Sequence, residues 1–419
     1  MSAEVAVSNS TSLDREATDG LAFAIGFFFS FRTVIVLLSV RLLGLEPSFG
    51  TALSLACNLL MFGVICFSSI GSQRAFVKQV LRLPAVRWIF CYLAFSCLSL
   101  TWSESASPAT SIAYWLGLVI DVCNVVLLVR DESRQETASA MMKGFIWSSC
   151  LLSIMAWVMP AQADLRLGDE QFFNTNEIGN LCAIALYFAQ FLTRRSREDL
   201  KLAKALLVIT LVRSLSKSTL LAFLVSESFL LIMDRSMRRR TKVLLLTSAL
   251  FLIGLFWGLF EAYYDVYTNA GNQADTLTGR TAIWLYVFGA TFDHPWTLWI
   301  GHGFDSWWKV VPPFGNELFE ARHAENEILQ QFYAYGAAGL VLLVGVYGSL
   351  LRQFRKLPSS PTRILFLSIM IFIVVRGLAV ADGFDLLLPL WLGVLLSAIA
   401  VKESDRNGRH DQSAIVTTL

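Results

Sequence analysis

Two strongly apolar segments, VLLLTSALFLIGLFWGLF at 243–260 and FYAYGAAGLVLLVGVYGSLL at 332–351, enclose a polar stretch that runs from Tyr263 to Gln331. Apolar runs of about 20 residues recur along the chain, which is the helix length needed to cross a hydrocarbon core about 30 Å thick. The 419 residues are only 16% charged, whereas soluble domains carry roughly 25% charged residues. The runs are continuous rather than alternating, so they predict an all-α polytopic membrane bundle and not a β-barrel.

The apolar runs predict about twelve membrane-spanning helices by their length. These are expected at Leu21–Leu43, Thr51–Ile70, Trp88–Thr101, Ala109–Val129, Ala138–Pro160, Ile178–Leu192, Leu202–Val212, Thr219–Met233, Val243–Phe260, Phe332–Leu351, Ile364–Val380 and Phe384–Val401. Residues 21–401 then form one integral membrane domain, in which residues 262–331 are a long loop between the ninth and tenth helices. Residues 1–20 and 402–419 are expected to be polar tails, the second of them disordered.

The basic residues of the short connections predict the orientation of these helices. Alternate connections are rich in Lys and Arg, as at 74–87, 194–204, 235–242 and 352–363, while those at 46–49 and 102–108 are poor in them. Both termini are therefore expected in the cytoplasm, and the long loop on the outer side, which is the periplasm in a bacterium. The first twenty residues lack the basic segment and cleavage site of a signal peptide.

Charged side chains inside membrane spans are costly, so each is a functional hypothesis by default. Such residues are Arg32, Asp121, Glu227 and Arg376, and Arg213 and Lys217 stand at the outer end of a helix. The alternative for all of them is structural pairing within the bundle or extension of the side chain to the interface. Arg376, Arg213 and Lys217 are the stronger functional candidates, because they lie on the side where the long loop emerges.

The long loop contains three of the four histidines, His294, His302 and His323. Their spacing matches no known metal pattern, so no metal site is predicted. Nothing resembles a P-loop or a nucleotide-binding glycine motif, so no cofactor is expected. The seven cysteines all lie in or beside apolar runs, where free cysteine is usually buried. His294 and His302 are expected to serve the structure.

Two groups of residues in the loop suit chemistry on a phosphate or a sugar. Arg280 stands in a Gly-Arg-Thr turn, and its planar guanidinium matches a diphosphate; alternatively it binds loop carbonyls. His323 stands in His-Ala-Glu-Asn, which is expected to open the helix that continues into Phe332–Leu351. In a helix, His323 and Asn326 would share one face and Glu325 would point elsewhere. His323 can act as a general base near neutral pH, or it can cap the helix.

Several motifs resemble the O-antigen ligase and polymerase superfamily in order and position. They are SLSKSTLL at 214–221, LTGRTAIW at 277–284, HPW and GHGF between 294 and 304, RHAENEIL at 322–329 with GAAGL at 336–340, and FNTNEI at 173–178. Members of this superfamily are bacterial inner-membrane proteins that handle undecaprenyl-diphosphate-linked glycans. Two departures occur: Lys217 stands where the family commonly has arginine, and Glu325 where many members have histidine.

The resemblance implies a metal-independent membrane glycosyltransferase. Arg280, with Lys217 or Arg213, would stabilise the leaving diphosphate, and His323 or Glu325 would deprotonate the acceptor. The further substrate-binding candidates are Arg376 and Arg166, the latter in a second outer loop at 161–177, together with Asn326 and Trp284.

The implied reaction is polymerisation of lipid-linked repeat units into exopolysaccharide or O-antigen. The first alternative is a ligase that transfers the glycan to the lipopolysaccharide core, and the second, from another class, is a flippase or transporter of lipid-linked glycans. The implied partners are the undecaprenyl-diphosphate-linked donor, a glycan or lipopolysaccharide-core acceptor, membrane lipids and other polysaccharide assembly proteins. No nucleic-acid partner is expected, because the basic connections lack interleaved aromatic residues.

Overall fold

The computed structural model describes residues 2–68, 80–129, 134–159, 166–168, 174–196, 198–234, 238–255, 257–258, 280–307, 323–358 and 360–417. Every regular element within these ranges is a helix, so the all-helical prediction is confirmed. The helices are α1 (Ser2–Arg41), α2 (Pro47–Ser68), α4 (Pro84–Ser99), α5 (Pro108–Leu128), α6 (Arg134–Val158), α7 (Thr175–Ser196), α8 (Lys201–Arg213), α9 (Lys217–Met233), α10 (Arg239–Leu255), α12 (Arg280–Phe292), α13 (Pro295–Ile300), α15 (Glu327–Lys356), α16 (Pro361–Gly377) and α17 (Leu390–Thr417).

The helices differ in their suitability as membrane spans. Five segments among the described residues are long and apolar enough to cross a bilayer: Thr18–Arg41, Ser48–Ser68, Pro108–Leu128, Gln135–Val158 and Glu327–Lys356. The twelve predicted spans, their orientation and the long outer loop therefore stay predictions. Residues 262–279 and 308–322 of that loop lie outside the described residues, whereas 280–307 form α12, α13 and the turn that follows them.

Both ends of the chain are helical in the structure, and their prediction as cytoplasmic tails stays a prediction. The prediction of a disordered segment after Lys402 is wrong, because α17 continues to Thr417. Once a helix has formed, each further residue adds a hydrogen bond at little cost, and no proline follows Leu390 to stop it. At the other end, α1 begins at Ser2.

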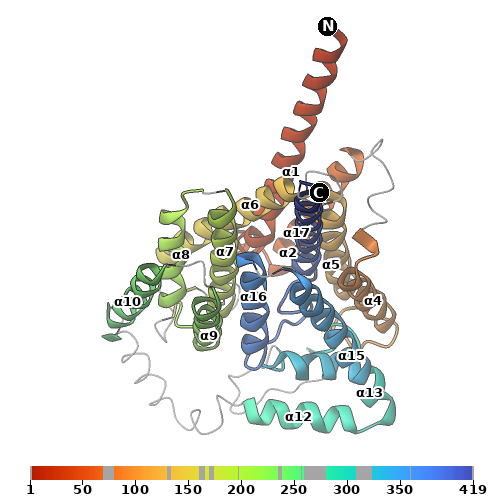
Figure 1. Ribbon diagram of the computed structural model, residues 1–419. Coiled ribbons are helices and arrows are strands. Elements are labelled where there is room, and N and C mark those ends of the chain that lie inside the picture. Colours follow the sequence, from red (N-terminus) through yellow and green to blue (C-terminus); the bar gives the residue numbers. More distant parts are fainter. Residues whose placement is uncertain are drawn as a thin grey trace.

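The bundle places α12 and α13 at one end and both chain termini at the other (Figure 1). Helices α15, α16 and α17 lie between α7–α10 on one side and α4 and α5 on the other. Within the largely aliphatic core, aromatic rings join helices of different parts of the chain: the Trp391 ring of α17 stacks on Phe29 of α1 with centroids 4.2 Å apart and contacts Phe145 of α6 at 5.9 Å. Three helices far apart in the sequence are thus joined by one indole.

Two glycines allow α1 and α6 to cross at close range. A Cβ atom built on Gly26 would lie 1.9 Å from the carbonyl oxygen of Met141, and one on Gly144 would lie 2.0 Å from that of Phe23. Small residues let helix backbones approach each other closely, which is a main source of packing energy between membrane helices. The α1–α6 crossing therefore depends on the absence of a side chain at both positions.

We predict that Gly26→Ala destabilises the protein by about 1–3 kcal/mol, because the added methyl group must push two backbones apart. The measurement is the thermal unfolding midpoint of the purified protein in detergent. Gly63→Ala in α2 is the matched control, since a Cβ atom there meets nothing within 4 Å and its stability should not fall. Equal midpoints for the two variants would contradict the close crossing.

Candidate functional site

The residues before α15 form a turn rather than the first turn of a helix. Asn326 is the N-cap: its backbone is extended, and its Oδ1 accepts a hydrogen bond from the Leu329 amide at 3.1 Å. Glu325 has a φ of 51°, in the left-handed region. The prediction that 323–326 open a helix with His323 and Asn326 on one face is therefore wrong, because an N-cap asparagine leaves the residues before it non-helical.

Buried polar contacts on both sides fix this turn. The Ala324 amide donates to Gln330 Oε1 at 2.8 Å, and the Ala324 carbonyl accepts from Trp284 Nε1 at 3.0 Å. The Nδ2 of Asn326 donates to the Leu378 carbonyl at 3.1 Å, just beyond the end of α16. Trp284 and Asn326 thus hold the turn against α12 and α16, and their roles in binding substrate stay predictions.

The Glu325 carboxylate lies between Arg280 and His323. Its Oε2 is 3.1 Å from Arg280 Nη2, and its Oε1 is 3.5 Å from His323 Nδ1. The Glu325 amide also donates to His323 Nδ1 at 3.3 Å, so a neutral imidazole with this bond carries its proton on Nε2. The structure therefore brings together the three residues that the sequence predicted as catalytic.

Of the other two predicted cations, Lys217 lies near Arg280 and Arg213 lies a few residues before Lys217. Lys217 begins α9 and lies just outside the predicted span; burial lowers the pKa of its ammonium group, and the nearby positive charges of Arg166 and Arg280 lower it further. Arg213 ends α8, immediately before the same segment, and burial lowers the pKa of its guanidinium group. Positive side chains from the connection between α6 and α7, from α9 and from α12 are therefore close to one another.

The helix termini add to this positive potential. Both α9 and α12 begin with one of these basic residues and have no acidic residue in the first turn. Helix N-termini carry partial positive charge and unpaired amide groups, which favour anions. The surroundings of Lys217 and Arg280 are thus suited to a phosphate or diphosphate group.

Arg376, in the last turn of α16, contacts the first turn of α9 and the first turn of α7. Its side chain is buried, and it donates from Nε to Thr219 Oγ1 and from Nη2 to the Asn176 carbonyl, both at 3.4 Å. Nη1 is buried without a hydrogen-bond partner among the described residues. Ser216 Oγ donates to Asn176 Oδ1 at 2.6 Å and so ties the same two segments together. Arg376 therefore supports the segment that carries Lys217.

His294 and His302 have contacts that favour structural roles. The His302 ring stacks on Tyr333 with centroids 4.4 Å apart, and burial lowers its pKa, which favours the neutral ring. His294 is exposed, precedes α13, and lies 3.5 Å from the Asp293 carboxylate. Among the described residues, no group of three or more His, Cys, Asp or Glu side chains is arranged to hold a metal ion.

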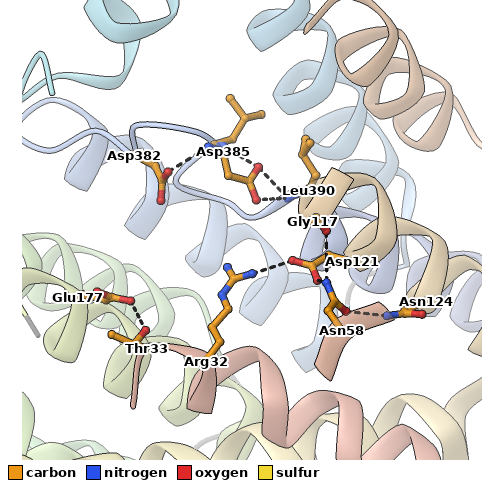
Figure 2. A network of polar contacts seen from close by, with 11 residues as sticks. Arg32, Thr33, Asn58, Gly117, Asp121, Asn124, Glu177, Asp382, Asp385 and Leu390 are labelled. Carbon is orange, nitrogen blue, oxygen red and sulfur yellow. Dashed lines mark hydrogen bonds and ion pairs between the residues drawn. The ribbon is translucent and has the colours of Figure 1, made fainter. Parts of the chain in front are cut away.

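Two charged residues of the predicted spans pair with each other. Arg32 Nη1 donates to Asp121 Oδ2 at 2.7 Å, and Asn58 Nδ2 donates to Asp121 Oδ1 at 2.7 Å (Figure 2). Asn124 in turn donates to Asn58 Oδ1 at 3.0 Å. A buried charge with this many partners is satisfied within the bundle, so the structural interpretation is favoured for Arg32 and Asp121. Glu227 likewise accepts a hydrogen bond from Gln190 at 2.8 Å.

The sequence reasoning missed two acids close to the site, one buried and one partly buried. Glu327 is buried at the start of α15 and accepts from Tyr347 Oη at 2.6 Å and from the Leu387 amide at 2.8 Å. Glu177, in the first turn of α7, accepts from Thr33 Oγ1 at 2.6 Å. Glu327 lies in the motif RHAENEIL and Glu177 in the motif FNTNEI. Their place in these motifs is the one feature of the sequence that could have marked them as site residues.

The comparison with known families agrees with this geometry. Residues 202–344 match the family model described as O-antigen ligase, and no curated protein matches the chain. The matched part contains Lys217, Arg280, His323 and Glu325, so the resemblance to the O-antigen ligase and polymerase superfamily is confirmed for this part of the chain. The match indicates a glycan-transferring enzyme, and together with the apolar helices it indicates a location in the bacterial inner membrane.

We predict that Glu325→Gln strengthens the binding of inorganic pyrophosphate to the purified protein by roughly two- to fivefold. The substitution removes the negative charge beside Arg280, and a partly exposed ion pair is worth about 0.2–1 kcal/mol. Isothermal titration calorimetry gives the dissociation constants. Glu46→Gln, an exposed acid in the α1–α2 connection, is the control for the change in total charge. An unchanged or weaker affinity in Glu325→Gln alone would show that Glu325 does not oppose an anion here.

Proposed function

We propose that the protein polymerises undecaprenyl-diphosphate-linked repeat units into exopolysaccharide or O-antigen at the periplasmic face of the inner membrane. The observation that carries the proposal is the Glu325 carboxylate, which lies within 3.5 Å of both the Arg280 guanidinium and the His323 imidazole. An arginine for a leaving diphosphate and a proton acceptor for an attacking hydroxyl are the two groups that such a transfer needs. The match of residues 202–344 to the O-antigen ligase family supports the same class of reaction.

In the proposed reaction, an acceptor hydroxyl attacks the anomeric carbon of the lipid-linked donor. A new bond forms from this carbon to the acceptor oxygen, the bond to the diphosphate oxygen breaks, and undecaprenyl diphosphate leaves with the electron pair. Negative charge develops on the diphosphate, and Arg280 and Lys217 stabilise it, with Arg166 nearby. Preorganised positive groups of this kind supply much of the rate in transfer reactions.

The proton of the hydroxyl goes to His323 in this mechanism. In the reacting tautomer the ring proton is on Nδ1 instead of Nε2; the hydrogen bond from the Glu325 amide to Nδ1 is then lost, and Nδ1 donates to the Glu325 carboxylate, 3.5 Å away. Nε2 then has a free electron pair for the acceptor proton. Glu325 would therefore orient the imidazole and stabilise its protonated form, as the carboxylate does in other carboxylate–histidine pairs. Direct proton abstraction by Glu325 is the alternative.

A ligase that moves finished glycan onto the lipopolysaccharide core is the second candidate, and the description of the matching family as O-antigen ligase favours it. Donor, leaving group and site residues are the same in both reactions. A flippase has less support, because transport of a lipid-linked glycan does not require a histidine and a carboxylate beside the phosphate-binding cations.

Arg280→Ala should lower the rate of glycan transfer by about 10²–10³-fold, which is the usual cost of removing one stabilising group from a developing anion. His323→Ala should cost about 10²–10⁴-fold, as for loss of a general base. The measurement is transfer in proteoliposomes with a radiolabelled undecaprenyl-diphosphate-linked donor. Arg352→Ala, an exposed arginine near the far end of α15, is the control and should retain the full rate. Wild-type rates in both Arg280→Ala and His323→Ala would refute the enzymatic assignment.

Deletion of the gene should shorten the surface glycan to single repeat units if the protein is a polymerase. Gel electrophoresis of glycans extracted from the deletion strain, beside the complemented strain, shows the chain lengths. Full-length glycan that stays on its lipid carrier would contradict the polymerase assignment and establish the ligase.

A further inference from the structure

A cavity of about 200 Å³ lies on the side of the turn reached by the His323 ring. It is lined by His323, Asp305, Gln330, Gln331, Tyr92 and Tyr335, among others. Pockets for drug-sized ligands are roughly 300–1,000 Å³, so this cavity suits one sugar ring rather than a lipid chain. We propose that it binds the sugar ring of the acceptor, whose hydroxyl attacks the donor. This inference rests on the glycan transfer proposed above.

Two buried amides give the cavity unpaired hydrogen-bond donors. Gln330 and Gln331 are each only 3% exposed. Their oxygens are engaged, by the Ala324 amide at 2.8 Å and by Tyr92 Oη at 3.1 Å, but their amide nitrogens have no partner among the described residues. These two nitrogens are not among the fully enclosed unpaired atoms of the described residues, so they are accessible at the cavity and can donate to a ligand or water there. The hydroxyl oxygens of a sugar are acceptors of the required kind.

Asp305 adds a hydrogen-bond acceptor to the lining of the same cavity. It follows Gly303 in a tight turn and has a φ of 58°, a conformation that aspartate tolerates better than most residues. Its Oδ2 accepts from Ser111 Oγ at 2.6 Å, which fixes the carboxylate. Its Oδ1 makes no hydrogen bond to the described residues and can accept one from a sugar hydroxyl. Donors and an acceptor facing one small space suit a ring that carries several hydroxyl groups.

The walls of the cavity are aromatic and rigid. Tyr92 and Tyr335 meet edge to face with centroids 5.6 Å apart, and Trp307 meets Tyr333 in the same way at 4.9 Å. Phe384, from the connection before α17, completes the lining. Aromatic walls with a few placed polar groups are typical of small-molecule sites, and they suit the apolar C–H faces of a pyranose.

The backbone holds the two sides of the cavity in register. The His302 amide donates to the Tyr333 carbonyl at 3.0 Å, and the Gly303 amide donates to the Ala334 carbonyl at 2.8 Å. Helix α15 is interrupted at Gly336, where φ is 60° and the backbone is not helical. A Cβ atom on Gly301 would lie 2.4 Å from the backbone of Ala334. Residues 301–303 therefore lie in direct contact with residues 333–336 of α15. This contact holds the loop that carries Asp305 close to Gln330 and Gln331.

The position of the cavity relative to the cations assigns it to the acceptor. His323 lines the cavity and also contacts Glu325, which pairs with Arg280. Arg280, Lys217 and Arg166 do not line the cavity. A sugar in the cavity would thus present a hydroxyl to the imidazole, while the diphosphate of the donor occupies the cationic side. The alternative source of the ring is the first sugar of the donor itself, and the experiment below separates the two.

Steady-state transfer by the full-length protein in proteoliposomes tests the assignment. The acceptor is one lipid-free repeat unit with a fluorescent aglycone, and the donor is radiolabelled and lipid-linked. Asp305→Asn should raise the KM for the acceptor at least about tenfold, because a hydrogen bond to a charged group is lost, while the KM for the donor and the affinity for pyrophosphate stay within twofold. Asp293→Asn, an exposed acid outside the cavity, is the matched control and should change neither KM.

Ala334→Val is the second variant, because this side chain lines the cavity and a larger one reduces its volume. Unfolding midpoints confirm that both variants are folded. An unchanged acceptor KM in either folded variant overturns the proposal, and so does a rise confined to the donor KM, which would assign the cavity to the donor sugar. Absence of transfer by the wild-type protein is a different result, and it overturns the proposed function together with this inference.

Discussion

The site depends on one ion pair, between the Arg280 guanidinium and the Glu325 carboxylate. Arg280 begins α12 and Glu325 lies just before α15, so their contact at 3.1 Å joins two segments of the matched region that are 45 residues apart. The same carboxylate approaches His323 at 3.5 Å. A partly exposed ion pair contributes little to the stability of the fold. Its effect is to position groups: Glu325 holds the Arg280 guanidinium and the His323 imidazole next to each other.

The free-energy cost of placing several positive side chains close together explains where in the bundle the candidate site lies. Charged groups in the hydrocarbon core are expensive, and Arg32 and Asp121 there are balanced by each other. Lys217, Arg280 and Arg166 are instead found at the starts of helices and in a connecting loop. Figure 1 places α12 at the end of the bundle, away from the chain termini. Net positive charge is tolerated at such an end because water and an anionic ligand can both reach it.

Much of this arrangement could be predicted from the sequence, and the failures have physical reasons. Apolar runs predict helices because hydrocarbon demands internally satisfied backbones, and a described helix overlaps each predicted range. The turn at 323–326 was mistaken for a helix because its non-helical backbone depends on tertiary contacts of Ala324 with Trp284 and Gln330. Glu327 was missed because its partners, Tyr347 and Leu387, lie 20 and 60 residues away and no local pattern shows them.

The two sides of His323 differ in the way a transfer reaction requires. On one side lie fixed cations and two helix starts without acidic residues in their first turns, which favour an anion whose charge grows during the reaction. On the other side, buried amides, a held carboxylate and aromatic rings favour a neutral ring with many hydroxyl groups. In the proposed reaction, the His323 imidazole would lie between the diphosphate of the donor and the sugar ring of the acceptor. The turn that carries His323 is held in place by hydrogen bonds of Ala324, Glu325 and Asn326. In the proposed reaction, a shift of this turn would move the imidazole away from both the donor and the acceptor.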